Sequence, residues 1–189
     1  MNYIKITKTD IANGEGVRCV LWVSGCDVHC EGCHNPESWD FCAGIHFDNA
    51  AMEELIEAVN RPWISGLTLS GGHPLAYDNL PDIYEICKSV KEKCPGKTIW
   101  LYTGYTLNES DFDNTVDACW DNGLLRNHIL AKCDVVVDGK YDKDLRDISL
   151  RFRGSSNQRI IDVKKTILNK KICLLDNQDE VERMAMSTL

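Results

Sequence analysis

Residues 19–35 read CVLWVSGCDVHCEGCHN and join a short apolar run to a loop that contains three cysteines. The apolar run, residues 19–23, predicts a buried β-strand. The loop that follows places Cys26, Cys30 and Cys33 in the spacing C-x3-C-x2-C. Three thiolates that converge from one loop suit a soft metal centre. The stretch therefore predicts a metal site at the end of a strand.

The rest of the chain alternates short apolar runs with helical patterns. Further strands are predicted at 66–69, 98–102, 135–137 and 159–162, and helices at 49–60, 80–93 and within 109–122. Asp48 or Asn49 would cap the first helix, and Pro81 suits the first turn of the second. This alternation predicts an α/β fold with a mostly parallel sheet.

Four of the predicted strands run directly into glycine. The junctions are Ser24-Gly25, Ser70-Gly71-Gly72, Thr103-Gly104 and Asp138-Gly139. Ligands of parallel α/β folds bind at the carboxyl ends of the strands, and glycine lets the backbone approach a ligand closely. We therefore expect a ligand site where these junctions meet. A complete eight-stranded barrel needs about 250 residues, so a chain of 189 residues is expected to form an incomplete one.

Composition narrows the class of protein. The net charge of −8 argues against a general nucleic-acid binder, which would carry a basic face. The sequence shows neither a cationic leader nor an apolar stretch of about 18 residues, so we expect a cytoplasmic protein without a membrane segment. In a reducing compartment, clustered cysteines bind metal or react more often than they form disulfides. The scattered cysteines are predicted to be small core residues: Cys19, Cys87, Cys94, Cys119, Cys133 and Cys173.

Three kinds of site compete for the cysteine loop. A structural zinc site needs four ligands, and a nearby histidine or Cys42 would have to be the fourth, because no second CxxC pair exists. A thioredoxin-like dithiol would use Cys30 and Cys33 at a helix start, which Pro36 disfavours, and would leave Cys26 unexplained. A 4Fe-4S cluster with three protein thiolates leaves one iron open to a small molecule. We expect the cluster.

The cysteine spacing is the signature of the radical S-adenosylmethionine superfamily, and SGGHP at residues 70–74 resembles its glycine-rich "GGEP" stretch. The likeness then becomes closer. In order along the chain, GVRCVLWVSGCDVHCEGCHNPESW, ISGLTLSGGHPL, CPGKTIWLYTGY, DVVVDGKY and RGSSNQRIID resemble the activating proteins of anaerobic (class III) ribonucleotide reductases. The resemblance covers roughly residues 1–162.

The resemblance implies a partial α/β barrel of radical S-adenosylmethionine type over residues 1–162, followed by a C-terminal extension, residues 163–189. It implies a 4Fe-4S cluster bound by Cys26, Cys30 and Cys33, and no catalytic side chain beyond the cluster and cofactor ligands. The implied residues that bind S-adenosylmethionine are Gly32, Cys33, His34, Gly71 and Gly72.

The implied reaction is reductive cleavage of S-adenosylmethionine to a 5′-deoxyadenosyl radical, which takes a hydrogen atom from a glycine of the large reductase subunit. A reductant such as flavodoxin would supply the electron, and neither nucleic acid nor membrane is implied. His73 departs from the superfamily pattern, which has an acidic residue there, and segments 105–134 and 163–189 are left without a role. The alternative functions are activation of another glycyl-radical enzyme, radical chemistry on a small substrate, and a non-catalytic zinc-stabilised module.

Overall fold

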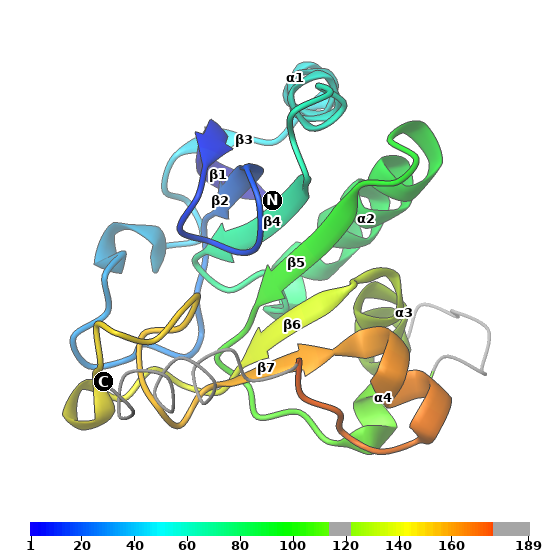
Figure 1. The fold of residues 1–189 in the computed structure, drawn as a ribbon. Coiled ribbons are helices and arrows are strands. Elements are labelled where there is room, and N and C mark those ends of the chain that lie inside the picture. Colours follow the sequence, from blue (N-terminus) through cyan, green and yellow to red (C-terminus); the bar gives the residue numbers. More distant parts are fainter. Residues whose placement is uncertain (114–121, 176–189) are drawn as a thin grey trace, which may run out of the picture.

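A seven-stranded mixed β-sheet organises the chain in the computed structural model, which describes residues 1–113 and 122–175 (Figure 1). The strand order is β3-β1-β2-β4-β5-β6-β7. The strands are β1 (Asn2–Asp10), β2 (Arg18–Val23), β3 (Ile45–His46), β4 (Gly66–Gly71), β5 (Thr98–Tyr102), β6 (Val135–Asp138) and β7 (Arg159–Asp162). The central strands β2, β4, β5 and β6 are mutually parallel, whereas β1, β3 and β7 pair antiparallel with their neighbours.

All five predicted strands are present, and the parallel arrangement is confirmed for the central four. The antiparallel edges differ from the sequence-based prediction. A parallel neighbour needs a crossover connection, usually an α-helix, but the connection from β6 to β7 contains only a 3-10 helix, η4 (Lys143–Leu145). The chain therefore returns beside β6 in the opposite direction. Strands β1 and β3, which extend the other edge of the sheet, are not among the strands predicted from the sequence.

Four α-helices are described: α1 (Asn49–Val59), α2 (Leu80–Lys93), α3 (Asn122–Lys132) and α4 (Val163–Asn169). As predicted, Asp48 caps α1, since its side chain accepts a hydrogen bond from the Ala51 amide at 2.9 Å, and Pro81 lies in the first turn of α2. The helix predicted within 109–122 falls largely on residues 114–121, outside the described residues. Before them lies a 3-10 helix, η3 (Glu109–Phe112).

The main apolar core lies between the helices and one face of the sheet (Figure 1). Leu21, Leu69 and Leu101 project into it from the parallel strands, and helix residues such as Leu55 and Ile86 cover them. The opposite face carries a smaller cluster, in which the ring of Trp100 meets that of Phe152 edge-on, with ring centres 5.3 Å apart. Within residues 1–113 and 122–175, loops rather than helices pack on this second face.

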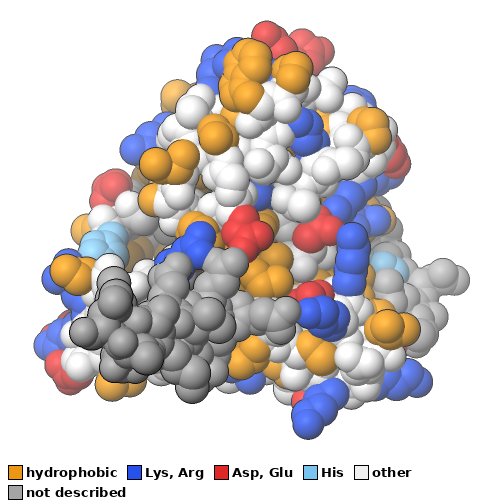
Figure 2. Space-filling view, viewed as in Figure 1, with side chains coloured by type: hydrophobic (Ala, Val, Ile, Leu, Met, Phe, Trp, Pro, Cys, Tyr) orange, Lys and Arg blue, Asp and Glu red, His pale blue; other side chains and the backbone are white. Residues whose placement is uncertain are grey.

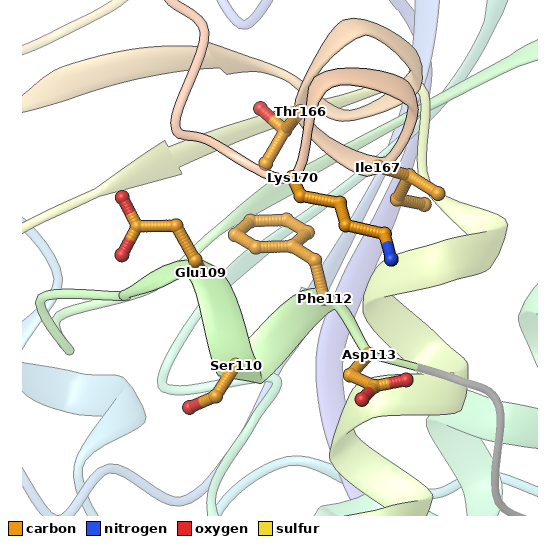
Figure 3. A pocket seen from close by; sticks show the side chains of 7 residues that line it. All are labelled: Glu109, Ser110, Phe112, Asp113, Thr166, Ile167 and Lys170. Carbon is orange, nitrogen blue, oxygen red and sulfur yellow. The ribbon is translucent and has the colours of Figure 1, made fainter.

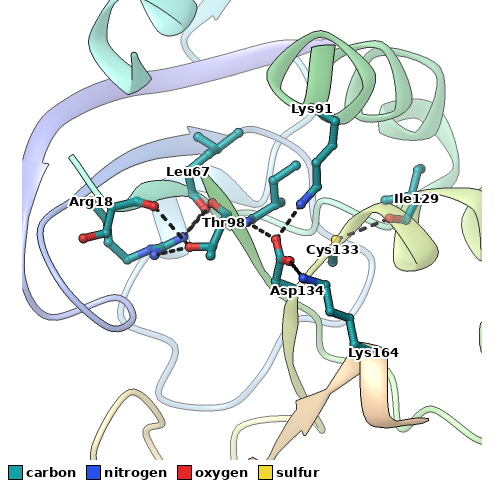
Figure 4. Close-up of polar contacts among 10 residues, drawn as sticks. Arg18, Leu67, Lys91, Thr98, Ile129, Cys133, Asp134 and Lys164 are labelled. Carbon is teal, nitrogen blue, oxygen red and sulfur yellow. Dashed lines mark hydrogen bonds and ion pairs between the residues drawn. The ribbon is translucent and has the colours of Figure 1, made fainter. Parts of the chain in front are cut away.

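A buried arginine and a partly buried aspartate lie at the amino ends of the parallel strands (Figure 4). Arg18, at the start of β2, is fully buried and donates to the Thr68 hydroxyl at 2.7 Å. Asp134, immediately before β6, accepts from the Ile99 amide at 2.8 Å and pairs with Lys91 at 2.6 Å. These contacts join neighbouring strands at the end of the sheet opposite to the glycine junctions.

Figure 2 shows apolar, basic and acidic side chains interspersed over the visible surface. Exposed lysines accompany α4 and the turn after it, at 164, 165, 170 and 171. In the described ranges, no helix combines the length and the apolar character that a membrane span requires. The nine described cysteines are free thiols. Cys19, Cys87, Cys94 and Cys133 are buried as predicted, Cys173 is half-buried, and Cys119 lies outside the described residues.

Candidate functional site

The glycine junctions that follow the parallel strands meet at one end of the sheet, as predicted. A hollow of about 140 Å³ opens there. It is lined by all three loop cysteines and by glycines that follow β4, β5 and β6: Cys26, Cys30, Cys33, Gly71, Gly72, Gly104 and Gly139. Segments far apart in sequence therefore form a single site at the carboxyl ends of the strands, where α/β folds bind their ligands.

The cysteine loop leaves β2 through a turn that requires glycine. Gly25 has a φ of +85°, and a Cβ atom there would overlap the ring of Phe41. The Gly25 amide donates to the Ser38 carbonyl at 2.8 Å, and the Cys26 amide donates to the Trp39 carbonyl at 3.1 Å. These two bonds hold Cys26, which is only 9% exposed, at the inner end of the loop.

The Gly-Gly turn after β4 packs directly against the start of this loop. The Gly72 amide donates to the Val23 carbonyl at 2.8 Å, and the His73 amide donates to the Gly25 carbonyl at 2.7 Å. A Cβ atom on Gly72 would lie 2.5 Å from the carbonyl oxygen of Gly25. Gly72 is therefore required by the approach of two backbones, one of which leads into the cysteine loop.

The side chain of His73 lies in a closed set of hydrogen bonds. Its Nδ1 is 2.5 Å from Asp27 Oδ1 and its Nε2 is 2.8 Å from Thr103 Oγ1. Tyr105 donates its hydroxyl to the other oxygen of Asp27 at 2.5 Å. Burial lowers the pKa of His73, partly offset by Asp27. Desolvation acts to raise the pKa of Asp27, but the hydrogen bonds from Tyr105 and His73 outweigh it and hold that pKa below its usual value.

A larger hollow of about 510 Å³ adjoins the first. The two share Cys30, Cys33, Ser70, Tyr102, Tyr141 and Gln158. Aromatic side chains line much of the larger hollow, including those of Trp22 and Phe152. The Tyr102 hydroxyl donates to the Phe152 carbonyl at 2.7 Å, which ties the end of β5 to the loop before β7.

Segment 151–158, which contains RGSSNQ, contributes Gln158 to both hollows and further residues to the larger one. Gln158 accepts from the Gly154 amide at 2.8 Å and donates to the Gly139 carbonyl at 3.1 Å. Behind it, the fully buried Asp138 pairs with Arg159, whose Nε lies 3.0 Å from Asp138 Oδ1. Gln158 and Tyr141 are site residues that the sequence analysis missed, because nothing in their local pattern indicates that they face the cysteines.

The thiols suit cluster binding better than dithiol chemistry. Burial raises the pKa of Cys30, and a backbone hydrogen bond from Tyr141 and the charge of Lys140 oppose this rise. A reactive dithiol needs a lowered pKa at a helix start, whereas residues 30–33 form a turn. Cys33 Sγ accepts from the Asn35 amide at 3.4 Å, a kind of contact that tunes iron–sulfur clusters.

The donor set fits a 4Fe-4S cluster, because three thiolates border one glycine-walled hollow and thiolates are the usual protein ligands of such clusters. Among residues 1–113 and 122–175, no group of three or more His, Cys, Asp or Glu side chains is placed to hold a single metal ion. A cubane cluster does not require such a group, since each cysteine binds a different iron.

The predicted site residues fall in three places. Cys26, Cys30, Cys33 and the two glycines of the Gly-Gly turn line the smaller hollow. His34 lines the larger one, where its ring centre is 5.6 Å from that of Tyr141. Gly32 is exposed and borders neither of these two hollows. Its φ of +73° gives it a role in the turn of the loop.

A separate hollow of about 440 Å³ lies between η3 and α4 (Figure 3). Phe112 of η3 and Lys170, which follows α4, line it together with Glu109 and Asp113. We assign no site to it.

Comparison with known proteins agrees with this site. Residues 12–161 match a family model described as a 4Fe-4S single cluster domain. The chain is 44% identical over 162 residues to the anaerobic ribonucleoside-triphosphate reductase-activating protein of Pasteurella multocida, covering 85% of this chain and 96% of that protein. The protein of the same name from Escherichia coli K12 is 40% identical, over 84% of this chain and 96% of that protein. The one from phage T4 is 38% identical, over 85% of this chain and 93% of that protein. The chain therefore belongs to the family of anaerobic ribonucleoside-triphosphate reductase-activating proteins.

Proposed function

We propose that this chain activates an anaerobic ribonucleotide reductase by forming a glycyl radical on its large subunit, with a 4Fe-4S cluster and S-adenosylmethionine as cofactors. One observation carries the proposal. The three loop cysteines and the Gly-Gly turn, from different strands, border one hollow within a segment that matches a 4Fe-4S domain. The partner, an anaerobic ribonucleotide reductase, is inferred from the names of the relatives.

Cys26, Cys30 and Cys33 would hold the cluster. Three thiolates leave one iron without a protein ligand, and this is where S-adenosylmethionine would bind. Gly71 and Gly72 would hold the amino acid end of that cofactor, because carbonyl groups of a glycine turn accept hydrogen bonds from an ammonium group with no side chain in the way. Cys33 and His34 would border the cofactor from the larger hollow, and Gly32 would shape the loop between the ligands.

When bound, the reduced cluster supplies the electron that cleaves S-adenosylmethionine and makes a radical able to take a hydrogen atom from glycine. The chain must place that chemistry near a loop of another protein. The larger hollow, about 510 Å³ and continuous with the cysteine site, offers room for a peptide segment. Its aromatic wall, which includes Trp22 and Tyr141, would exclude water from the reacting groups.

The proposal extends to the fold. Residues 1–162 would form a partial α/β barrel of radical S-adenosylmethionine type, and residues 163–189 a C-terminal extension. The four parallel strands with helices on one face support the partial barrel. Val163 of α4 is buried and Leu174 forms a bridge with Ile161, and these contacts support the proposal that the extension packs on the core.

The electron would come from a one-electron donor such as flavodoxin in the cytoplasm, without nucleic acid or membrane as a partner. The net charge of −8 favours protein and small-molecule partners over nucleic acid.

Anaerobic reconstitution with iron and sulfide tests the cofactors. Electron paramagnetic resonance of the reduced protein should show a 4Fe-4S signal, and S-adenosylmethionine should change that signal because one iron is open. Cys30→Ala should abolish cluster assembly. Cys42→Ala is the matched control, since Cys42 is an exposed free thiol in the same region that lines neither hollow of the site. A zinc-loaded protein without a cluster signal would contradict the proposal.

The partner is tested separately. The reconstituted chain, S-adenosylmethionine and a reductant are added to the purified large reductase subunit, and the glycyl radical is sought by its resonance doublet. A cluster-competent chain that produces no doublet there, but produces one on a different glycyl-radical enzyme, would replace the reductase by that enzyme.

A further inference from the structure

His73 joins the Gly-Gly turn to the cysteine loop by its side chain as well as by its backbone. The imidazole is 1% exposed, so it is isolated from solvent. Asp27, its partner at 2.5 Å, is the residue directly after Cys26. A buried side chain from one strand end therefore holds the residue that directly follows the first cysteine of the loop.

The hydrogens in this set of bonds can be assigned from their partners. The Asp27 carboxylate can only accept, so His73 Nδ1 carries a hydrogen and donates to it. In the neutral imidazole, Nε2 then accepts from the Thr103 hydroxyl at 2.8 Å, and Thr103 Oγ1 also accepts from the Tyr105 amide at 3.1 Å. Both ring nitrogens of His73 are thus engaged by the protein, and neither is left for a cofactor.

Further contacts hold the cysteine loop on both sides of the hydrogen bond between His73 and Asp27. Tyr105 donates to the second oxygen of Asp27, and the next residue, Val28, packs so closely on Gly104 that a Cβ there would lie 2.8 Å from it. Residues 26–28 are consequently fixed against the ends of β4 and β5. Hydrogen bonds behind the ligands of a metal centre typically change its affinity by about 10- to 100-fold.

We propose that His73 is a positioning residue: acting through Asp27, it holds the cysteine loop in the geometry that retains the cluster, and it does not bind S-adenosylmethionine. This inference rests on the proposed function, since it concerns the same cluster. It also accounts for the histidine at a position where the superfamily pattern has an acid. A carboxylate at the buried position 73 would face the carboxylate of Asp27, whose side chain is 43% exposed.

The test compares wild-type protein with His73→Asp, Asp27→Asn, the double variant and Thr103→Val. Each is reconstituted anaerobically and desalted, and iron and sulfide per chain are followed with time. S-adenosylmethionine affinity is measured by titrating the resonance signal of the reduced cluster. Asp40→Asn is the matched control, because Asp40 is also an aspartate near the loop but bonds the Cys42 amide instead of His73. Circular dichroism reports whether each variant is folded.

We expect His73→Asp to lose iron about tenfold faster than wild type, because two carboxylates repel each other. Adding Asp27→Asn should restore most of the retention, since the amide can donate to the new carboxylate. Thr103→Val keeps the imidazole of His73 but removes the hydrogen-bond partner of its Nε2. This variant therefore tests the same hydrogen bonds if His73→Asp does not fold. It should lose iron faster than Asp40→Asn.

Three results would overturn the inference. The first is a His73→Asp variant that retains iron like wild type and binds S-adenosylmethionine more tightly. The second is equal loss of iron from His73→Asp and from the double variant, and the third is equal loss of iron from Thr103→Val and Asp40→Asn. Failure of the wild-type protein to assemble a cluster would instead contradict the proposed function.

Discussion

Gly25 and Gly72 approach each other so closely that a single added carbon atom would not fit. The Cβ of an alanine at Gly72 would lie 2.5 Å from the Gly25 carbonyl oxygen, and the neighbouring amide of His73 donates to that same oxygen at 2.7 Å. The contact links the ends of β2 and β4. It therefore sets how the cysteine loop lies relative to the turn that would hold the cofactor.

We predict that Gly72→Ala displaces the cysteine loop, lowers cluster content and reduces the free energy of unfolding by about 1–3 kcal/mol. Gly96→Ala is the control: a Cβ at Gly96 meets nothing within 4 Å, although the φ of +82° there adds a backbone strain that Gly72 does not have. That variant carries backbone strain alone and should keep the cluster. Iron analysis and urea unfolding measure the two effects, and equal cluster content in both variants would argue against the contact.

Arg159→Leu should remove about 3 kcal/mol or more from the free energy of unfolding. Asp138 is fully buried, and without the guanidinium it would become an uncompensated buried charge. Lys8→Leu is the control, since Lys8 and Glu54 form an exposed pair at 2.7 Å and such pairs contribute about 1 kcal/mol or less. If urea unfolding gives both variants the same small loss, the buried pair does not stabilise the end of β6.

Arg18→Lys should destabilise the protein by about 2 kcal/mol or more, although the charge is kept. The guanidinium donates to Thr68, to the Leu67 carbonyl and to both oxygens of Thr98, and one ammonium group cannot reach all of them. The same change at the half-exposed Arg61 should cost less than about 0.5 kcal/mol. Thermal unfolding compares the two, and a tolerated Arg18→Lys would show that the fork of hydrogen bonds is dispensable.

Asp134 should make the free energy of unfolding depend on pH in the acidic range. Desolvation acts to raise its pKa, but hydrogen bonds from Lys91 and the Ile99 amide outweigh this and hold it below its usual value. A carboxyl whose pKa is lower in the folded state stabilises the fold above its unfolded pKa of about 3.9, and this stabilisation is lost as pH falls through the folded pKa.

In the metal-free chain, the stability difference between wild type and Asp134→Asn should therefore shrink as the pH is lowered from 7 to below 4. Lys91→Met should reduce the pH dependence of wild type. Lys164→Met should change it less, because Lys164 is 83% exposed and lies farther away, at 3.3 Å. A difference that stays constant over this pH range would contradict the assignment.

Much of the site could be predicted from local sequence. The C-x3-C-x2-C spacing, the Gly-Gly dipeptide and the strands that run into glycine are short-range patterns, and the structure brings Cys26, Cys30, Cys33, Gly71 and Gly72 to one hollow as these patterns indicate. Strands and helices with apolar periodicity were equally readable, down to the cap at Asp48.

The local sequence specifies the chemistry of the site: three soft donors on one loop, next to turns that admit a backbone or a ligand. The way in which that loop is held depends instead on long-range contacts. His73, Thr103, Tyr105 and Asp27 come from three different strand ends, and their bonds span up to 78 positions along the chain. No local pattern encodes such contacts, because they depend on the register and twist of the sheet, which the whole core sets. The direction of β7 was decided in the same way, by the return path of the chain after β6 and not by the four residues of the strand.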